Sequence, residues 1–123
     1  EQTVEEPADT DFVKITDYIP DIVIDLKYAT TDNFTGTVIY DFKDAYLRYG
    51  TVKKLAVAQE KFKSMGYYIK IWDAYRPFAA QEKLWQVCPN PRYVANPANG
   101  MKAHNLGGTI DMTLLTDLAY RNS

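Results

Sequence analysis

Histidine and cysteine are the scarcest residues of this sequence, which has one of each among its 123 residues. A single cysteine, Cys88, cannot close a disulfide within the chain or supply a metal site built from several cysteines. Cysteine content therefore does not indicate the redox compartment. Cys88 itself is expected to be a small packed hydrophobic residue at the end of a helix.

The sequence also lacks an excess of positive charge and any long apolar run. Its formal net charge is −2 and its pI is near 5.3, so no basic surface is expected for a nucleic acid. No apolar stretch reaches the roughly 20 residues that a membrane-spanning helix needs. With 46% hydrophobic and 24% charged residues, the composition is that of one globular domain.

Residues 1–11 differ in composition from residues 12–123. The first segment is acidic, contains Pro7 and has few large apolar residues, so it is expected to be a flexible leader. The second is expected to form a single domain. The sequence begins without Met, and its polar start resembles what remains after removal of a signal peptide, although a trimmed chain would look the same. We expect a periplasmic or secreted location, with the cytoplasm as the alternative.

Short apolar runs and amphipathic stretches predict an α+β fold. β-branched residues favour strands at 12–15 and 22–28, and turn residues predict a loop at 29–37. The clearest helix, 51–65, has apolar residues at steps of three and four and a lysine-rich opposite face. Gly66 follows it, where a helix-ending glycine belongs.

Two further strands and a second helix complete the predicted fold. A strand is expected at 67–72, a helix at 77–87, and a half-buried strand at 108–115, where polar and apolar residues alternate. The connection 88–100 is rich in Pro and Gly and is expected to be a loop. The prediction is a small, mainly antiparallel sheet with helices packed on it.

The only histidine, His104, stands seven residues before a carboxylate, Asp111. A neutral imidazole and an ionised carboxylate are standard zinc ligands, and three protein ligands plus a water are typical of a catalytic zinc site. In the pattern His-x-x-Gly-x-x-x-Asp, Gly107 permits a backbone turn that a side chain would resist. The strand that follows then directs Asp111 back toward His104. The alternative is a chance spacing, in which His104 is an ordinary polar residue.

A second candidate stretch, Asp-Ala-Tyr-Arg-Pro at 73–77, follows the strand 67–72. Pro77 is expected at the first position of a helix, so that Asp73 and Arg76 project from the C-terminal end of the strand. In a functional role, Arg76 would lie beside a reacting carbonyl or a tetrahedral oxyanion, where a fixed positive charge stabilises the transition state. The alternative is a surface ion pair worth about 0–1 kcal/mol.

Three short blocks occur in a fixed order: Asp-Leu-Lys-Tyr-Ala-Thr-Thr-Asp-Asn-Phe-Thr-Gly at 25–36, Asp-Ala-Tyr-Arg-Pro at 73–77, and His-x-x-Gly-x-x-x-Asp at 104–111. Together they make the sequence similar to the D-alanyl-D-alanine dipeptidase family, the zinc D,D-dipeptidases of vancomycin resistance and peptidoglycan turnover. Each block alone is weakly specific, whereas the three in order are specific. The resemblance covers most of residues 17–115.

The resemblance implies a Zn²⁺ ion held by His104, Asp111 and a further histidine, with a water activated by the metal attacking the peptide carbonyl. It also implies that Arg76 stabilises the tetrahedral intermediate. Four residues are implied in substrate binding or in support of the site: Asp73, Tyr28, Asn33 and Lys102. Asn33 has a second interpretation as a turn residue. The expected function is zinc-dependent hydrolysis of D-alanyl-D-alanine or a related D,D-dipeptide in cell-wall peptide metabolism.

The sequence departs from the family pattern at several positions. In the family, the further histidine closes a Glu-Trp-Trp-His segment, and the Glu of this segment is the general base. This sequence contains no such segment, so neither its Glu nor its His has a counterpart here. The residue two before the motif histidine is usually Ser, where this sequence has Lys102. The residue two before the motif Asp is usually Ala, where it has Thr109. The change at Lys102 bears on substrate preference more than on the metal.

The absent ligand has two interpretations, a fragment of a longer protein or a truncated homologue without full activity. We favour the fragment, because ending a mixed domain after a central strand would leave a strand edge unpaired. Two other functions stay open: a zinc D,D-carboxypeptidase or endopeptidase acting on peptidoglycan peptides, and an inactive homologue that binds wall peptides. No pattern predicts the oligomeric state.

Overall fold

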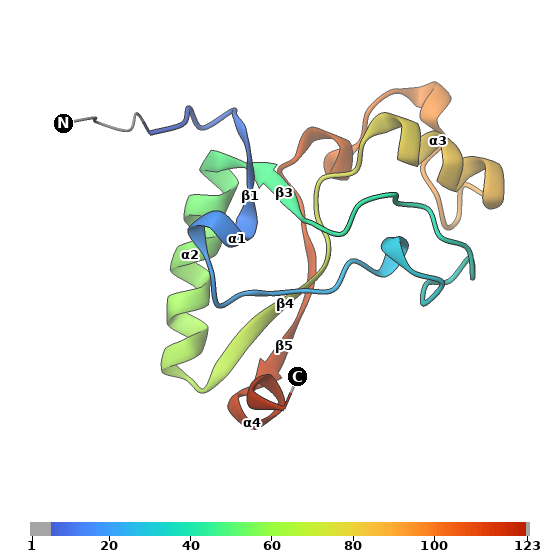
Figure 1. Cartoon of the computed structure of the whole chain (residues 1–123). Coiled ribbons are helices and arrows are strands. Elements are labelled where there is room, and N and C mark those ends of the chain that lie inside the picture. Colours follow the sequence, from blue (N-terminus) through green and yellow to red (C-terminus); the bar gives the residue numbers. More distant parts are fainter. Residues whose placement is uncertain (1–5, 123) are drawn as a thin grey trace.

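Two small sheets, built from distant parts of the chain, form the centre of the fold (Figure 1). The structure is a computed structural model that describes residues 6–122. In one sheet, β1 (Phe12–Lys14) pairs antiparallel with β3 (Tyr46–Arg48). In the other, the strand order is β2 (Val23–Ile24), β4 (Tyr67–Asp73) and β5 (Asp111–Thr116).

Helices flank these strands. The α-helices within residues 6–122 are α1 (Ile15–Tyr18), α2 (Tyr49–Ser64), α3 (Phe78–Val87) and α4 (Asp117–Arg121). Short 3₁₀ turns lie at Lys27–Ala29, Pro97–Asn99 and Ala103–Leu106. Figure 1 shows α2 and α3 on opposite sides of the central strands. Over the part of the chain that the structure describes, no helix has the length and apolar character needed to cross a membrane.

The arrangement confirms the predicted α+β class with mainly antiparallel pairing. β4 is antiparallel to β5 and β1 is antiparallel to β3, whereas β2 is parallel to β4. The parallel pairing is possible because a long connection that contains α2 separates β2 from β4, as a crossover between parallel strands requires.

The apolar core lies between α2 and the strands. Val52 and Leu55 of α2 are buried in the same cluster as Ile69 and Ile71 of β4. Burial of one such side chain contributes about 1.5–3 kcal/mol. Gln59 is also fully buried, and its Oε1 accepts a hydrogen bond of 3.0 Å from the backbone N–H of Ile69. This packing fixes β4, and with it the residues at the C-terminal end of β4.

Both predicted helices are confirmed with small changes at their ends. The predicted helix 51–65 is α2, and Gly66 after it has a φ of 86°, the left-handed conformation that ends many helices. The predicted helix 77–87 is α3. Pro77 has an extended backbone, with φ −55° and ψ 147°, and therefore precedes the helix instead of occupying its first position.

The predicted strand 22–28 is wrong for most of its length. Only β2 pairs with β4, and the backbone N–H of Asp25 still donates to the Ile71 carbonyl at 2.9 Å. The chain then turns into the 3₁₀ turn Lys27–Ala29. The β-branched residues correctly predict that a strand is present. Its length depends on how far it pairs with β4, because strand formation depends strongly on the neighbouring strands.

The other predicted strands are confirmed with moved ends. The prediction 12–15 corresponds to β1, except that Ile15 begins α1. The prediction 67–72 corresponds to β4, and the prediction 108–115 to β5, which starts at Asp111. The Asp111 carboxylate therefore lies at the first position of its strand, beside the end of β4.

Of the predicted leader 1–11, residues 1–5 lie outside the described residues. From Glu6 onward it contacts the N-terminal part of α2. Glu6 Oε1 accepts a hydrogen bond of 2.6 Å from the Tyr49 hydroxyl, and Asp9 Oδ1 lies 2.7 Å from Lys53 Nζ. The second half of the predicted leader is thus in contact with the domain, through Glu6 and Asp9.

Candidate metal centre

The end of β4 and the start of β5 bring two carboxylates opposite each other. In the strand register, Ile71 pairs with Met112 and Asp73 pairs with Asp111, which leaves Trp72 as an extra residue of β4. Such a β-bulge re-aims side chains and is frequent next to active sites. Two aspartates directly opposite each other destabilise an antiparallel pair. This position therefore favours positive charge nearby.

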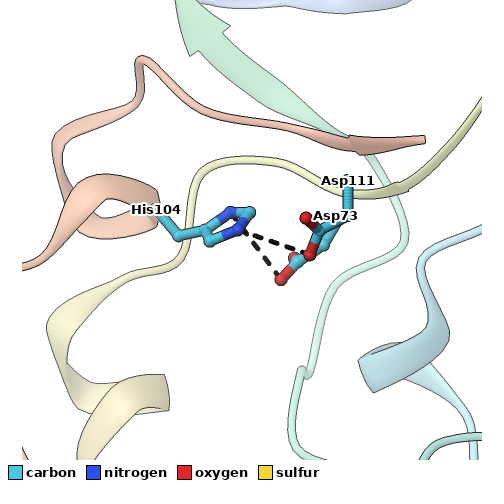
Figure 2. Close-up of side chains that lie close together, drawn as sticks. All are labelled: Asp73, His104 and Asp111. Carbon is cyan, nitrogen blue, oxygen red and sulfur yellow. Dashed lines mark ion pairs between the residues drawn. The ribbon is translucent and has the colours of Figure 1, made fainter. Parts of the chain in front are cut away.

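His104 lies beside both carboxylates, on the turn Ala103–Leu106 (Figure 2). Its Nδ1 is 2.9 Å from the backbone oxygen of Ala74. Because that oxygen only accepts hydrogen bonds, the neutral ring carries its proton on Nδ1 and its lone pair on Nε2. Nε2 lies 3.4 Å from Asp111 Oδ2. Metal-binding histidines are usually fixed in this way, through a hydrogen bond from the other ring nitrogen.

His104 and Asp111 fit two positions of a tetrahedral zinc site. Ligand atoms at about 2.0–2.1 Å from zinc lie about 3.3–3.5 Å from each other, which agrees with the 3.4 Å between Nε2 and Oδ2. The Asp111 side chain is 59% exposed, so its lone pairs are accessible. Together with Asp73, the two residues form a group whose ligand atoms all lie within 4.8 Å of one another.

Asp73 is a poorer ligand, because its oxygens are already engaged. Its side chain is 2% exposed. Oδ1 accepts from the Tyr40 hydroxyl at 2.6 Å and from the backbone N–H of Ala74 at 3.0 Å, and Oδ2 accepts from Arg76 Nη2 at 2.6 Å. The His104 atom that lies 3.8 Å from Asp73 Oδ2 is Nδ1, the protonated nitrogen. Asp73 therefore holds neighbouring side chains in place.

Arg76 is held on three sides by buried side chains. Besides Nη2 on Asp73, Nε donates to the Tyr40 hydroxyl at 3.1 Å and Nη1 donates to Gln81 Oε1 at 2.7 Å. The Tyr28 ring faces the guanidinium, with 5.2 Å between Cζ and the ring centroid. Burial lowers the pKa of Arg76, but Tyr40 and Asp73 outweigh this effect and raise the pKa above its ordinary value. The guanidinium is thus a permanent charge with a fixed orientation.

A cavity of about 720 Å³ opens beside the two carboxylates. Its volume falls in the range of about 300–1,000 Å³ that small-molecule sites have. Tyr28, Asn33 and Asp73, which the sequence implied in binding or support, line this cavity, and Arg76 and Lys102 do not. Arg76 lies against Tyr28 and Asp73, two residues of the cavity wall.

Asn33 and Lys102, which the resemblance implied in substrate binding or support, both make hydrogen bonds within the chain. Asn33 Nδ2 donates to the Thr30 carbonyl at 2.8 Å and to the Thr37 carbonyl at 2.9 Å. The amide therefore shapes the loop wall, in agreement with the interpretation as a turn residue. Lys102 is exposed, and its backbone N–H donates to Asn105 Oδ1 at 2.9 Å.

Sequence reasoning did not identify three buried polar residues that support the site: Tyr40, Gln81 and Asn105. Asn105 Nδ2 donates to the Arg76 carbonyl at 2.8 Å, and the backbone N–H of Arg76 donates to the His104 carbonyl at 2.9 Å. These bonds tie the histidine turn to the arginine. The position of Asn105 next to the only histidine was a usable signal, whereas Tyr40 and Gln81 belong to no chemical pattern.

Gly107 meets the expectation for the motif glycine. Its φ is 72°, in the left-handed region that favours glycine. A Cβ at this position would overlap the Phe12 ring. Arg48 holds the same turn, since Nε donates to the Leu106 carbonyl at 2.5 Å and the backbone N–H donates to the Gly107 carbonyl at 3.0 Å. The turn after His104 therefore requires glycine for its conformation and for the approach of β1.

Fold and site together define a small α+β domain with a candidate metal site, in which one imidazole and one exposed carboxylate lie beside a buried Asp–Arg pair. Sequence comparison identifies the family. The chain belongs to the D-ala-D-ala dipeptidase family, whose profile matches residues 8–120. The family recognised from the three sequence blocks is therefore confirmed.

Three curated relatives show the extent of the similarity. The chain is 40% identical over 105 residues to the D-alanyl-D-alanine dipeptidase of Escherichia coli K12, an alignment that covers 85% of this chain and 54% of the relative. It is 32% identical over 98 residues to the enzyme of that name from Enterococcus faecium, covering 78% and 46%. It is 30% identical over 127 residues to the one from Streptomyces coelicolor, covering 85% and 61%. The chain thus spans about half the length of the curated relatives it matches.

Proposed function

We propose that this chain serves the zinc-dependent hydrolysis of D-alanyl-D-alanine or a closely related D,D-dipeptide. The observation that carries the proposal is the pair His104 and Asp111, whose Nε2 and Oδ2 lie 3.4 Å apart while Nδ1 is bonded to the Ala74 carbonyl. The family and the names of the relatives support the substrate class. The cell-wall setting and the periplasmic or secreted location stay predictions from the sequence.

A Zn²⁺ ion at this site would polarise the scissile carbonyl and lower the pKa of a water molecule. His104 would bind it as a neutral imidazole and Asp111 as an ionised carboxylate. A catalytic zinc site normally has a third protein ligand, and the sequence contains no second histidine. We assign neither this ligand nor the general base to Asp73, because three of its roughly four acceptor sites already accept hydrogen bonds and its side chain is 2% exposed.

The chain's own residues provide orientation and fixed charge. Arg76 lies behind Tyr28 and Asp73 in the cavity wall and does not itself line the cavity, so its fixed charge would act from behind this wall on the negative charge that develops on the carbonyl oxygen. A guanidinium already fixed in place needs no reorganisation during the reaction. Asp73 aligns that guanidinium through the 2.6 Å bond to Nη2. Tyr28 covers one face of Arg76 and also lines the cavity, so it would separate the charge from bulk water.

Zinc content and product release in the full-length protein test the proposal. Purified protein should contain zinc and release D-alanine from D-alanyl-D-alanine, while L-alanyl-L-alanine stays intact. An acylated peptide that ends in D-Ala-D-Ala is the matched control, because rapid cleavage of it would instead favour the carboxypeptidase alternative. Binding of wall peptides without turnover, in protein with stoichiometric zinc, would contradict the proposal and favour the inactive homologue.

A further inference from the structure

Tyr40 connects the two charged groups beside the candidate metal site. Its side chain is buried, and its hydroxyl donates to Asp73 Oδ1 at 2.6 Å and accepts from Arg76 Nε at 3.1 Å. Asp73 Oδ2 in turn accepts from Arg76 Nη2 at 2.6 Å. The three side chains therefore form a closed triangle of hydrogen bonds, in which each fixes the orientation of the other two.

The ring that carries this hydroxyl is itself held in place. It stacks on Phe42 with 4.5 Å between ring centroids and lies 5.6 Å from the Tyr28 ring. The backbone N–H of Tyr40 donates to the Tyr28 carbonyl at 2.8 Å. Because close-packed interiors leave such a ring little freedom, the hydroxyl is a rigid support for the more flexible side chain of Arg76.

The chemical state of Tyr40 suits support and not proton transfer. Burial, followed by the charge of Asp73, raises the pKa of the Tyr40 hydroxyl well above its ordinary value. The hydroxyl therefore stays protonated and remains a donor to Asp73. Tyr40 does not line the cavity beside the two carboxylates, so a direct contact with substrate is not expected there.

We propose that Tyr40 is a positioning residue for the hydrolysis proposed above, on which this inference rests: its hydroxyl fixes the Arg76 guanidinium relative to Asp73 and thereby relative to the substrate carbonyl. Without the hydroxyl, Arg76 Nε loses its acceptor. The bond from Nη2 to Asp73 then remains as the link between the two charged groups. Hydrogen bonds to charged groups are the stronger class. The orientation of the guanidinium should therefore become less defined while its charge is retained.

The first experiment measures this orientation without using activity. In ¹⁵N-labelled full-length protein, the Arg76 Nε–H signal is assigned by its loss in Arg76→Lys. We expect slow hydrogen exchange in the wild type and exchange at least about tenfold faster in Tyr40→Phe, since a bond to a charged group is lost. Tyr67→Phe makes the same chemical change at the opposite, exposed end of β4 and should leave the signal unchanged. An unchanged exchange rate in Tyr40→Phe overturns the proposal.

The second experiment asks whether the orientation matters for the reaction. In zinc-loaded full-length protein, Tyr40→Phe should lower kcat and kcat/KM by the same factor of about 10- to 100-fold, with unchanged zinc content. In an Arg76→Met background the same change should have little further effect, because coupled residues are not additive. A full loss in both backgrounds contradicts the proposal.

Two outcomes separate this inference from the proposed function. If wild-type protein with bound zinc does not hydrolyse D-alanyl-D-alanine, the proposed function fails, while the exchange experiment still decides whether Tyr40 orients Arg76. If Tyr40→Phe does not fold, Tyr40→p-aminophenylalanine keeps a donor to Asp73 but is a poor acceptor for Arg76 Nε, because the amine lone pair is delocalised into the ring. That variant should show faster Nε–H exchange and a lowered kcat, and wild-type values of both would refute the role.

Discussion

Asp73 and Asp111 face each other across β4 and β5, and both lie close to His104, yet they differ in nearly every physical respect. The Asp73 side chain is 2% exposed and accepts hydrogen bonds from three donors, whereas the Asp111 side chain is 59% exposed and faces the lone pair of His104 Nε2. A carboxylate whose oxygens are occupied holds its neighbours, and one with accessible lone pairs can bind a metal. Proximity to histidine alone does not distinguish these roles.

The same difference separates the two segments that carry these residues. The corner that follows β4 is stabilised by bonds among buried side chains, with Arg76 at the centre. The segment from His104 to Asp111 is attached to that corner by backbone groups and by Asn105. Changes in the corner should therefore alter stability and orientation, and changes in the segment should alter metal binding. Substitutions in each segment test this division.

The largest effect is expected for His104→Ala in the full-length protein. Loss of a metal ligand should cost more than the 10- to 100-fold in affinity that loss of an outer hydrogen-bond partner typically costs, so zinc and activity should disappear together. Elemental analysis after dialysis against a weak chelator measures this. Stoichiometric zinc in the variant would exclude His104 as a ligand.

Stability should separate the two carboxylates. Asp73→Ala leaves the buried guanidinium of Arg76 without its anion and should destabilise the metal-free protein by about 3–5 kcal/mol. Asp111→Ala changes an exposed side chain and should stay within about 0.5 kcal/mol. Urea unfolding of the two metal-free variants provides the comparison, and equal losses would contradict the difference drawn between them.

A smaller effect is expected for Arg76→Lys. The charge is retained, but a point charge cannot make the three bonds to Asp73, Tyr40 and Gln81 that the guanidinium fork makes. We expect kcat and kcat/KM to fall together by about 10- to 100-fold with zinc still bound. A rise in KM at unchanged kcat would show that Arg76 binds substrate and transition state equally.

The smallest effect is expected for Lys102→Ala. Its side chain is exposed and lies outside the residues that line the cavity, so stability should change by no more than about 0.5 kcal/mol. Zinc content and KM should stay at their wild-type values. A clear change in KM for D-alanyl-D-alanine would instead restore the substrate-binding role that the sequence implied.

The sequence predicts the elements whose pattern is local. The helix 51–65 was found because its apolar spacing and Gly66 are properties of the segment itself. The strand 22–28 was overestimated, because only β2 finds a partner on β4. The segment after β2 turns away, and no local pattern shows where a parallel partner ends. The β-bulge at Trp72 was also invisible, since it depends on the register between two strands.

The site shows the same limit. His104, Asp111, Asp73 and Arg76 were found because they lie in short motifs. Tyr40 was missed because it lies 33 positions before Asp73 in an irregular segment, so the contact exists only in the folded chain. The occupancy of the Asp73 oxygens could not be predicted either, because it depends on that distant hydroxyl. The resemblance thus placed Asp111 at the metal and Asp73 in a binding or supporting role, whereas the hydrogen bonds that separate the two carboxylates physically are seen only in the folded chain.

Zinc affinity in Asp111→Asn and Asp73→Asn tests the central claim most directly. Both changes remove one negative charge and keep the size of the side chain, and competition with a chelator of known affinity measures each variant in the full-length protein. We predict that Asp111→Asn weakens zinc binding more than the 10- to 100-fold typical of an outer partner, while Asp73→Asn stays within that range. A larger loss in Asp73→Asn than in Asp111→Asn would contradict the proposal that Asp111 is a ligand and that Asp73 holds Arg76 in place.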